Sequence, residues 1–213
     1  MNLDLASKLY SLPGIILGLT VHEYAHAWAS WKLGDETARE DGRLSLNPLK
    51  HIDPIGFLFL LVAGFGWAKP VRFNRERLAK PRRDEALIAA AGPLSNLALG
   101  VILSIVVRLL DLGLGLAGLT MPDLAFEVFI YAIFINYGLF VFNLIPLPPL
   151  DGSHVFFSAL RLRPETEAAI FRWGSMALFG ILIIGTAAKI DLLPIGKVVQ
   201  AIAKLVFSAL GWL

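Results

Sequence analysis

The sequence predicts a mainly α-helical, polytopic membrane protein with about four to six transmembrane helices. Of its 213 residues, 56% are hydrophobic and only 17% are charged, whereas about a quarter of the residues of soluble domains are charged. Several hydrophobic runs approach the roughly 20 residues that cross a bilayer as a helix. We therefore expect a single integral-membrane domain over 1–213, with a core at 3–160 and C-terminal helices at 166–213.

Proline, glycine and charged residues separate the hydrophobic runs and bound the expected helices. The runs long enough to cross the bilayer are 13–33 (or 3–33), 84–110, 124–145 and 166–188. A short helix is expected at 153–161. The last hydrophobic segment, 194–212, carries two lysines, so it is either a fifth span or an amphipathic helix on the membrane surface.

The connection between the first two spans has two features of its own. Alternating polar and apolar residues at 43–46 and 69–73 predict two short strands that could pair as a small β element. Between them, the apolar run 55–67 is too short to cross the bilayer as a helix. We expect that run to be a re-entrant or interfacial segment.

Positive charge predicts which side of the membrane this connection faces. Residues 32–83 hold 11 of the 19 lysines and arginines, and the loop at 111–125 holds none. Because cytoplasmic loops are enriched in lysine and arginine, we expect the first connection on the cytoplasmic side of the cell membrane and the second on the external side.

Two histidines and a glutamate interrupt the first hydrophobic run, in the sequence HEYAH at 22–26. Ionisable side chains in a membrane-length helix are costly, so they are candidates for function. His22 and His26 share one face of a helix, where both imidazoles can bind one zinc ion. Glu23 lies close enough to take a proton from a zinc-bound water. The alternative is histidines satisfied by backbone or water, and the apolar surroundings disfavour it.

A catalytic zinc site of this kind needs a third protein ligand and one open position. The chain has no cysteine, which excludes thiol chemistry. Asp151 is the candidate, because three prolines between 146 and 149 break the third span directly before it, on the same side of the membrane as HEYAH. The alternative is an aspartate that only caps the next helix. We predict one zinc ion per chain, bound by His22, His26 and Asp151.

The segment GPLSN at 92–96 lies within the second expected span. We interpret Gly92 as a residue for close helix packing. Asn96 needs a hydrogen-bond partner, because a side-chain amide in lipid is costly without one. In the polar connection, His51 and Asp53 are rival metal ligands. Turn formation explains Asp53 and a backbone hydrogen bond would explain His51, so we expect neither to bind the metal.

These motifs resemble those of the site-2 protease family of intramembrane zinc metalloproteases. The resemblance rests on HEYAH, on GPLSN and on NLIPLPPLDG at 143–152, in that order. The stretches at 42–56 and 64–71 resemble its compact prokaryotic branch, which lacks PDZ and CBS domains. The resemblance supports the zinc ligands and Glu23 as general base. It also implies that Asn143 holds the oxyanion or the substrate.

The implied activity is hydrolysis of peptide bonds in or near transmembrane segments of other membrane proteins. The expected partners are a transmembrane protein substrate and the lipid bilayer, with no nucleic acid, and the active site is expected toward the cytoplasmic side. A segment such as 69–73 could hold an unwound substrate by strand addition. The competing hypothesis is a zinc carrier or a non-proteolytic zinc scaffold. A carrier needs polar groups along a path open to both sides. The spans add only Arg108 and Glu127 near their external ends, where we expect both side chains to snorkel or to face water.

Overall fold

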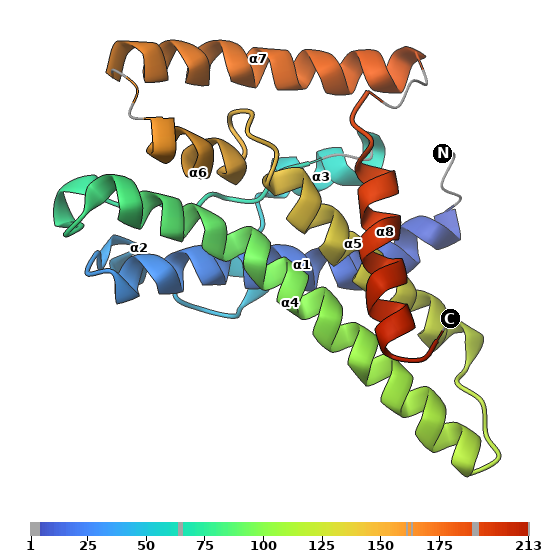
Figure 1. The fold of residues 1–213 in the computed structure, drawn as a ribbon. Helices are drawn as coiled ribbons and strands as arrows, with labels where there is room; N and C mark the ends of the chain where they lie inside the picture. The colour runs from blue at the N-terminus through green and yellow to red at the C-terminus, as the bar shows by residue number, and fades with distance from the viewer. Residues whose placement is uncertain (1–4, 64–65, 161, 163, 189–191, 213) are drawn as a thin grey trace.

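The computed structural model describes residues 5–63, 66–160, 162, 164–188 and 192–212. The long helices α1 (Leu5–Lys32), α4 (Pro81–Leu116) and α5 (Asp123–Asn143) pack against one another and form the centre of the molecule (Figure 1). The other elements are α2 (Thr37–Glu40), η1 (Pro48–Lys50), α3 (Pro54–Ala63), η2 (Arg75–Arg77), α6 (Asp151–Leu160), α7 (Pro164–Ala188) and α8 (Ile195–Ala209).

Among the described residues, three helical segments are long and apolar enough to cross a membrane. They are 81–116, 123–143 and 165–185. The prediction of a mainly helical membrane protein is therefore confirmed, while the number of four to six spans stays a prediction. Helix α1 is not among these three segments, although its 28 residues are enough to cross a bilayer. The polar HEYAH side chains lower its mean hydropathy.

Helix α4 is longer than the sequence suggested. It runs for 36 residues, so that it includes the first six residues of the expected external loop at 111–125. At about 1.5 Å per residue it is roughly 54 Å long, well beyond the thickness of the hydrocarbon core. Pro93 lies inside it and lacks the N–H that would bond one turn earlier.

Small residues allow the central helices to approach closely. A Cβ atom added at Gly14 of α1 would lie 2.6 Å from the Cα atom of Ala132 in α5, which is closer than carbon atoms pack. Glycine and alanine at this crossing bring the two backbones together, as small residues do between membrane helices.

Helix α8 packs on α5 and α4. Its buried residues Val199 and Ala203 join the core around Tyr137. Arg108 does not simply point to water as expected. Its Nε donates to Leu210 O over 3.1 Å and its Nη2 donates to Gly211 O over 3.0 Å. The guanidinium thus satisfies carbonyls that the end of α8 leaves without helical partners.

The length of α8 bears on the segment 194–212. With 15 residues the helix is about 22 Å long, shorter than the hydrocarbon core that a span must cross. Its apolar residues concentrate on the face that meets α5. Whether the segment 194–212 crosses the membrane or lies on its surface stays a prediction.

The two strands expected at 43–46 and 69–73 do not form, so that prediction is wrong. In the described part of the connection, an isolated antiparallel bridge joins Ile52 and Ala68 instead. The backbone N–H of Lys69 donates to His51 O over 2.8 Å. The bridge therefore lies next to the two predicted segments and not between them.

The side chain of Arg43 explains why no ladder forms there. Its guanidinium donates to the carbonyl oxygens of both Lys50 and Lys69, and it is buried at 5% exposure. A side chain therefore lies where a paired strand was expected. Pro70 also removes one backbone donor from the segment.

The apolar run at 55–67 contains the short helix α3, preceded by Asp53. The carboxylate of Asp53 accepts from the N–H groups of Ile55 (2.9 Å) and Gly56 (2.8 Å) and so caps the helix. Ten residues cannot span a bilayer, as predicted. Its depth in the membrane stays a prediction, and residues 64 and 65 lie outside the described residues.

Asp35 joins the end of α1 to the segment that precedes η2. It is fully buried, and its carboxylate accepts from Ser30 Oγ (2.9 Å), Thr37 Oγ1 (2.6 Å), Thr37 N–H (3.0 Å) and Asn74 N–H (2.7 Å). Burial alone raises the pKa of Asp35, but these hydrogen bonds outweigh burial and hold the pKa below its ordinary value.

Replacing Asp35 with alanine should destabilise the fold, because four donors lose a charged acceptor. We expect a loss of about 2–3 kcal/mol, or roughly 5–10 °C in the unfolding midpoint in detergent. The stabilisation should be present above the ordinary carboxyl pKa and lost as the pH falls through the lower folded-state pKa. The control is Glu36→Ala, which removes only an exposed pair with Arg39. Equal midpoints for the two variants would contradict this role.

Candidate metal centre

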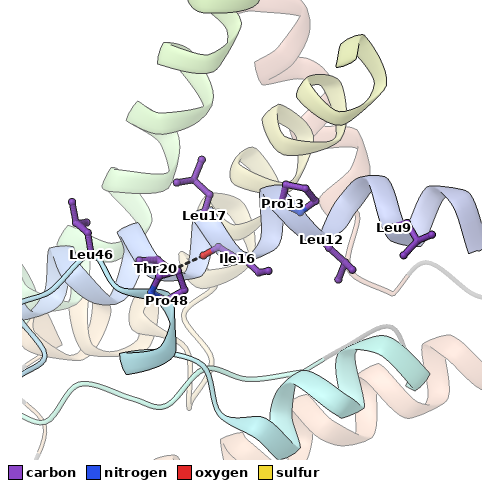
Figure 2. Close-up of a pocket in the computed structure, with 8 residues that line it drawn as sticks. All are labelled: Leu9, Leu12, Pro13, Ile16, Leu17, Thr20, Leu46 and Pro48. Carbon is purple, nitrogen blue, oxygen red and sulfur yellow. Dashed lines mark hydrogen bonds between the residues drawn. The ribbon is translucent and has the colours of Figure 1, made fainter. Parts of the chain in front are cut away.

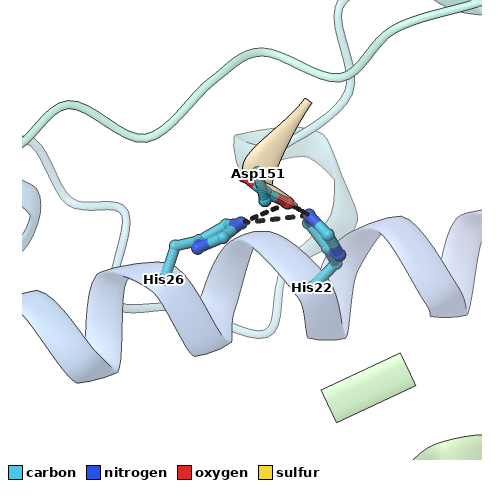
Figure 3. A group of neighbouring side chains, drawn as sticks. All are labelled: His22, His26 and Asp151. Atoms are coloured by element: carbon cyan, nitrogen blue, oxygen red, sulfur yellow. Dashed lines mark hydrogen bonds and ion pairs between the residues drawn. The ribbon is translucent and has the colours of Figure 1, made fainter. Parts of the chain in front are cut away.

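His22 and His26 lie on one face of α1 and point toward a common centre. Both side chains are buried, and their Nε2 atoms are 3.0 Å apart. Asp151, from α6, brings its Oδ2 atom to 3.1 Å from His22 Nε2 and 3.4 Å from His26 Nε2 (Figure 3). The structure thus brings together the three side chains that the sequence proposed as ligands.

The broken backbone after α5 explains how Asp151 reaches α1. Helix α5 ends at Asn143, and a turn over 144–150 redirects the chain so that α6 begins at Asp151. Gly152 lies against the carbonyl of Leu144, where an added Cβ would be 2.3 Å from the oxygen. The carboxylate therefore faces the two histidines.

The chemistry of the three contact atoms fits a metal cation. His26 Nδ1 lies 2.8 Å from Ile88 O, and a carbonyl oxygen can only accept, so Nδ1 carries a proton. In the neutral imidazole, Nε2 then presents its lone pair. Asp151 Oδ2 is buried without a hydrogen-bond partner among the described residues. Electron-pair donors that converge at such distances repel one another unless a cation lies between them. Imidazole nitrogen and carboxylate oxygen are typical zinc ligands.

Glu23 lies beside this group and has a defined backbone contact. It is buried at 8% exposure, and its Oε2 accepts from the N–H of Val71 over 3.1 Å. Arg43, which holds the neighbouring Lys69 carbonyl, carries the nearby positive charge. Burial lowers the pKa of Arg43, and the charge of Glu23 partly offsets that effect. The polar connection therefore orients Glu23.

A cavity of about 910 Å³ opens onto the three metal-binding candidates and Glu23. Its walls are largely apolar and come from α3, α5, α7 and the segment 66–73. Asn143 lies on this wall, with its Nδ2 donating to Leu139 O over 3.1 Å. The cavity has room for a stretch of polypeptide, and its surface suits apolar side chains.

A second hollow, of about 550 Å³, lies between α1 and the segment before η1 (Figure 2). Its lining is apolar apart from Thr20, whose hydroxyl donates to Ile16 O over 2.6 Å. None of the described residues that line it is ionisable. These residues therefore offer no group for acid–base or metal chemistry.

Sequence reasoning missed the contact that Gly92 makes. The residue was interpreted as one for helix packing alone, yet it lies directly against both imidazoles. A Cβ atom added there would lie 2.3 Å from His26 Nε2 and 2.7 Å from His22 Cε1. Asn96, one turn further along α4, meets His22 Nδ1 over 2.6 Å. The GPLSN motif was the signal, but only the fold shows which side chains it faces.

A polar cluster that joins α6, α4 and α7 was also missed. His154 lines the cavity, one turn after Asp151, and its Nδ1 lies 2.9 Å from Glu85 Oε1. Arg75 contacts both Glu85 and, over 3.1 Å, Glu167 of α7. These contacts link α7 to the part of the cavity wall that His154 forms. Its members are far apart in the sequence, so no local pattern marks them.

The rival ligands in the polar connection do not join the site. His51 is buried with its Nε2 2.6 Å from Ser45 O, and Asp53 caps α3. Among the described residues, the group of three metal-binding side chains is that of His22, His26 and Asp151. That neither His51 nor Asp53 binds a metal stays a prediction.

Replacing Gly92 with alanine should weaken metal binding, because the added methyl group would overlap both imidazoles and displace them. We expect zinc affinity to fall by about tenfold or more, measured by competition with a chromophoric chelator. Gly113→Ala is the matched control, since it lies on the same helix with nothing within 4 Å of an added Cβ. Unchanged affinity in Gly92→Ala would be inconsistent with this contact.

Comparison with known proteins identifies the family. Residues 117–184 match the model of peptidase family M50. YwhC of Bacillus subtilis, named as a candidate zinc metalloprotease, is 44% identical over 149 residues, which cover 68% of this chain and 67% of YwhC. The Rip2 proteins of Mycolicibacterium smegmatis and Mycobacterium tuberculosis, named likewise, are 32% and 30% identical, covering 81% and 84% of this chain and 66% and 68% of their own lengths.

The chain spans about two thirds of the length of these relatives. No solved structure gives a significant match. The segment that matches the family model includes Asp151 but not HEYAH. The identity with YwhC extends over enough of both chains to establish the relationship independently. The chain therefore belongs to peptidase family M50, the site-2 protease family of zinc metalloproteases.

Proposed function

We propose that this protein hydrolyses peptide bonds in or near the transmembrane segments of membrane-protein substrates. The observation that carries the proposal is the convergence of His22 Nε2, His26 Nε2 and Asp151 Oδ2 on one buried point. The point lies on an apolar cavity that also exposes Glu23. Membership of a peptidase family supports the same reaction class.

His22, His26 and Asp151 would hold one zinc ion per chain. A zinc ion bound there supplies a Lewis acid that polarises a carbonyl group and makes a water molecule more acidic. Three protein ligands leave a fourth position open, which is typical of catalytic rather than structural zinc sites. Asp151 Oδ2 is buried and has no hydrogen-bond partner among the described residues, which supports its inclusion in the ligand set.

Glu23 would act as the general base and then as the general acid. Its carboxylate takes the proton from the attacking water and later passes that proton to the leaving amine. The N–H of Val71 holds one carboxylate oxygen, which leaves the other for the proton. Asn143 lies on the cavity wall, and its amide could donate to the oxyanion or bind the substrate backbone.

The cavity suits an unwound, apolar stretch of polypeptide. A helical substrate must open locally, because its carbonyl groups are otherwise engaged in helical hydrogen bonds. Strand addition along 69–73 is now less well supported. The N–H groups of Lys69 and Val71 already have partners, and Pro70 has no N–H.

The charge distribution supports a cytoplasmic-side active site in the cell membrane. The basic connection between α1 and α4 contacts Glu23 directly through Val71. If this connection faces the cytoplasm, as its lysines and arginines indicate, the metal centre lies near the same face. An integral-membrane metalloprotease domain over 1–213 remains part of the proposal.

Replacing Glu23 with glutamine should abolish cleavage while leaving zinc binding intact. The amide keeps an oxygen to accept from Val71 but cannot take a proton, so we expect a loss of about 10²–10⁴-fold in cleavage. The measurement compares membrane proteomes of cells that produce either form, and intact substrates should accumulate with Glu23→Gln. Glu36→Gln is the exposed control. Undiminished cleavage by the Glu23→Gln protein would rule out this base.

Replacing Asp151 with asparagine should remove bound zinc. The substitution preserves size but removes the negative ligand, so zinc affinity should fall by more than the roughly 10–100-fold cost of losing an outer partner. Asp53→Asn is the matched control, because asparagine can still cap α3 and Asp53 lies outside the ligand group. Zinc content is measured by elemental analysis of purified protein. If Asp53→Asn lost its zinc while Asp151→Asn kept it, Asp53 and not Asp151 would be the ligand.

A further inference from the structure

Two asparagines lie fully buried in adjacent central helices, where an unpaired amide is costly. Asn96 of α4 and Asn136 of α5 are both 0% exposed. Asn96 Nδ2 donates to Gly18 O over 3.0 Å and to Asn136 Oδ1 over 2.9 Å. Asn136 Nδ2 donates to Ala132 O over 2.8 Å. The remaining polar atom, Asn96 Oδ1, lies 2.6 Å from His22 Nδ1.

Backbone carbonyls fix the direction of each hydrogen bond made by these two asparagines. The oxygens of Ala132 and Gly18 can only accept, so each must meet an amide NH₂ group. Asn136 therefore presents its oxygen to Asn96, and Asn96 presents its nitrogen to both Asn136 and Gly18. Asn96 Oδ1 is left facing the imidazole, and because it only accepts, His22 Nδ1 must carry the proton.

We propose that Asn96 is a positioning residue that holds His22 in the tautomer and orientation required for metal binding. With the proton on Nδ1, the lone pair of Nε2 faces His26 and Asp151. In the other tautomer, an Nε2–H group would point at the ligand centre and no lone pair would be available. The proposal rests on the zinc site described above and adds a residue outside its ligand set.

The two histidines are held by α4 in different ways. His26 Nδ1 bonds to a backbone carbonyl, that of Ile88, which no substitution removes. His22 depends on a side chain, so its positioning can be tested by mutation. Outer partners of metal-binding histidines typically contribute about 10–100-fold to metal affinity.

A purely structural role for Asn96 makes a different prediction. If the amide served only to join α1, α4 and α5, its two donated hydrogen bonds would matter most. If it positions His22, the accepting oxygen matters most. Asn96→Asp separates the two roles, because aspartate retains the acceptor and loses the donors. Asn96→Leu removes both at similar volume.

The experiment measures the zinc affinity of the 213-residue chain in detergent by chelator competition, together with the visible spectrum of Co²⁺ as a probe of ligand geometry. We expect Asn96→Leu to lose about 10–100-fold in affinity with a changed Co²⁺ spectrum. Asn96→Asp should bind zinc within about threefold of wild type or more tightly, because carboxylate–histidine pairs also support zinc.

Ser104→Ala is the control for packing. Ser104 is fully buried on the same helix and bonds Tyr137 of α5 over 3.1 Å, away from the metal centre, so its loss should leave zinc affinity unchanged. If Asn96→Leu does not fold, Asn96→Asp decides alone: retained affinity supports positioning, and a loss of tenfold or more overturns it. Wild-type affinity in Asn96→Leu also overturns it. Failure of the wild-type protein to bind zinc would instead overturn the proposed function.

Discussion

The close approach of α4 to the HEYAH face of α1 is the contact on which the site depends. Gly92 leaves room for both imidazoles, and α4 supplies the acceptors for both Nδ1 atoms, from Ile88 and Asn96. In an apolar environment such polar groups must find partners within the protein. One helix therefore meets the steric and the hydrogen-bonding needs of the motif, and it turns both Nε2 atoms toward the same point.

The remaining chemistry is brought to this point by irregular backbone. The turn after α5 places Asp151 opposite the histidines, and the polar connection brings Val71 to Glu23. Irregular segments at membrane depth are tolerated where they are buried in protein or line a cavity, and both of these segments border the same cavity. Rigid helices thus carry two ligands, while the segments that break helical structure deliver the third ligand and orient the base.

Local patterns predicted the parts of the site that depend on local geometry. His22 and His26 follow from helical spacing, and Asp151 from the prolines that precede it. The contacts that the sequence could not provide are tertiary. Alternation at 43–46 predicted a strand, but the guanidinium of Arg43 bonds the carbonyls where a ladder was expected. Arg108 was expected to snorkel or to face water, and its guanidinium instead donates to carbonyls at the end of α8. No local pattern could show this contact, because its two sides lie about a hundred residues apart in the chain.

The central claim is that two imidazole nitrogens and one carboxylate oxygen hold a zinc ion. X-ray absorption at the zinc edge, on protein purified in detergent, tests it most directly. We predict two imidazole nitrogens and at least one oxygen at about 2.0–2.2 Å, with a changed oxygen shell in Asp151→Asn. Zinc with a single imidazole neighbour, or a spectrum that Asp151→Asn leaves unaltered, would contradict the claim.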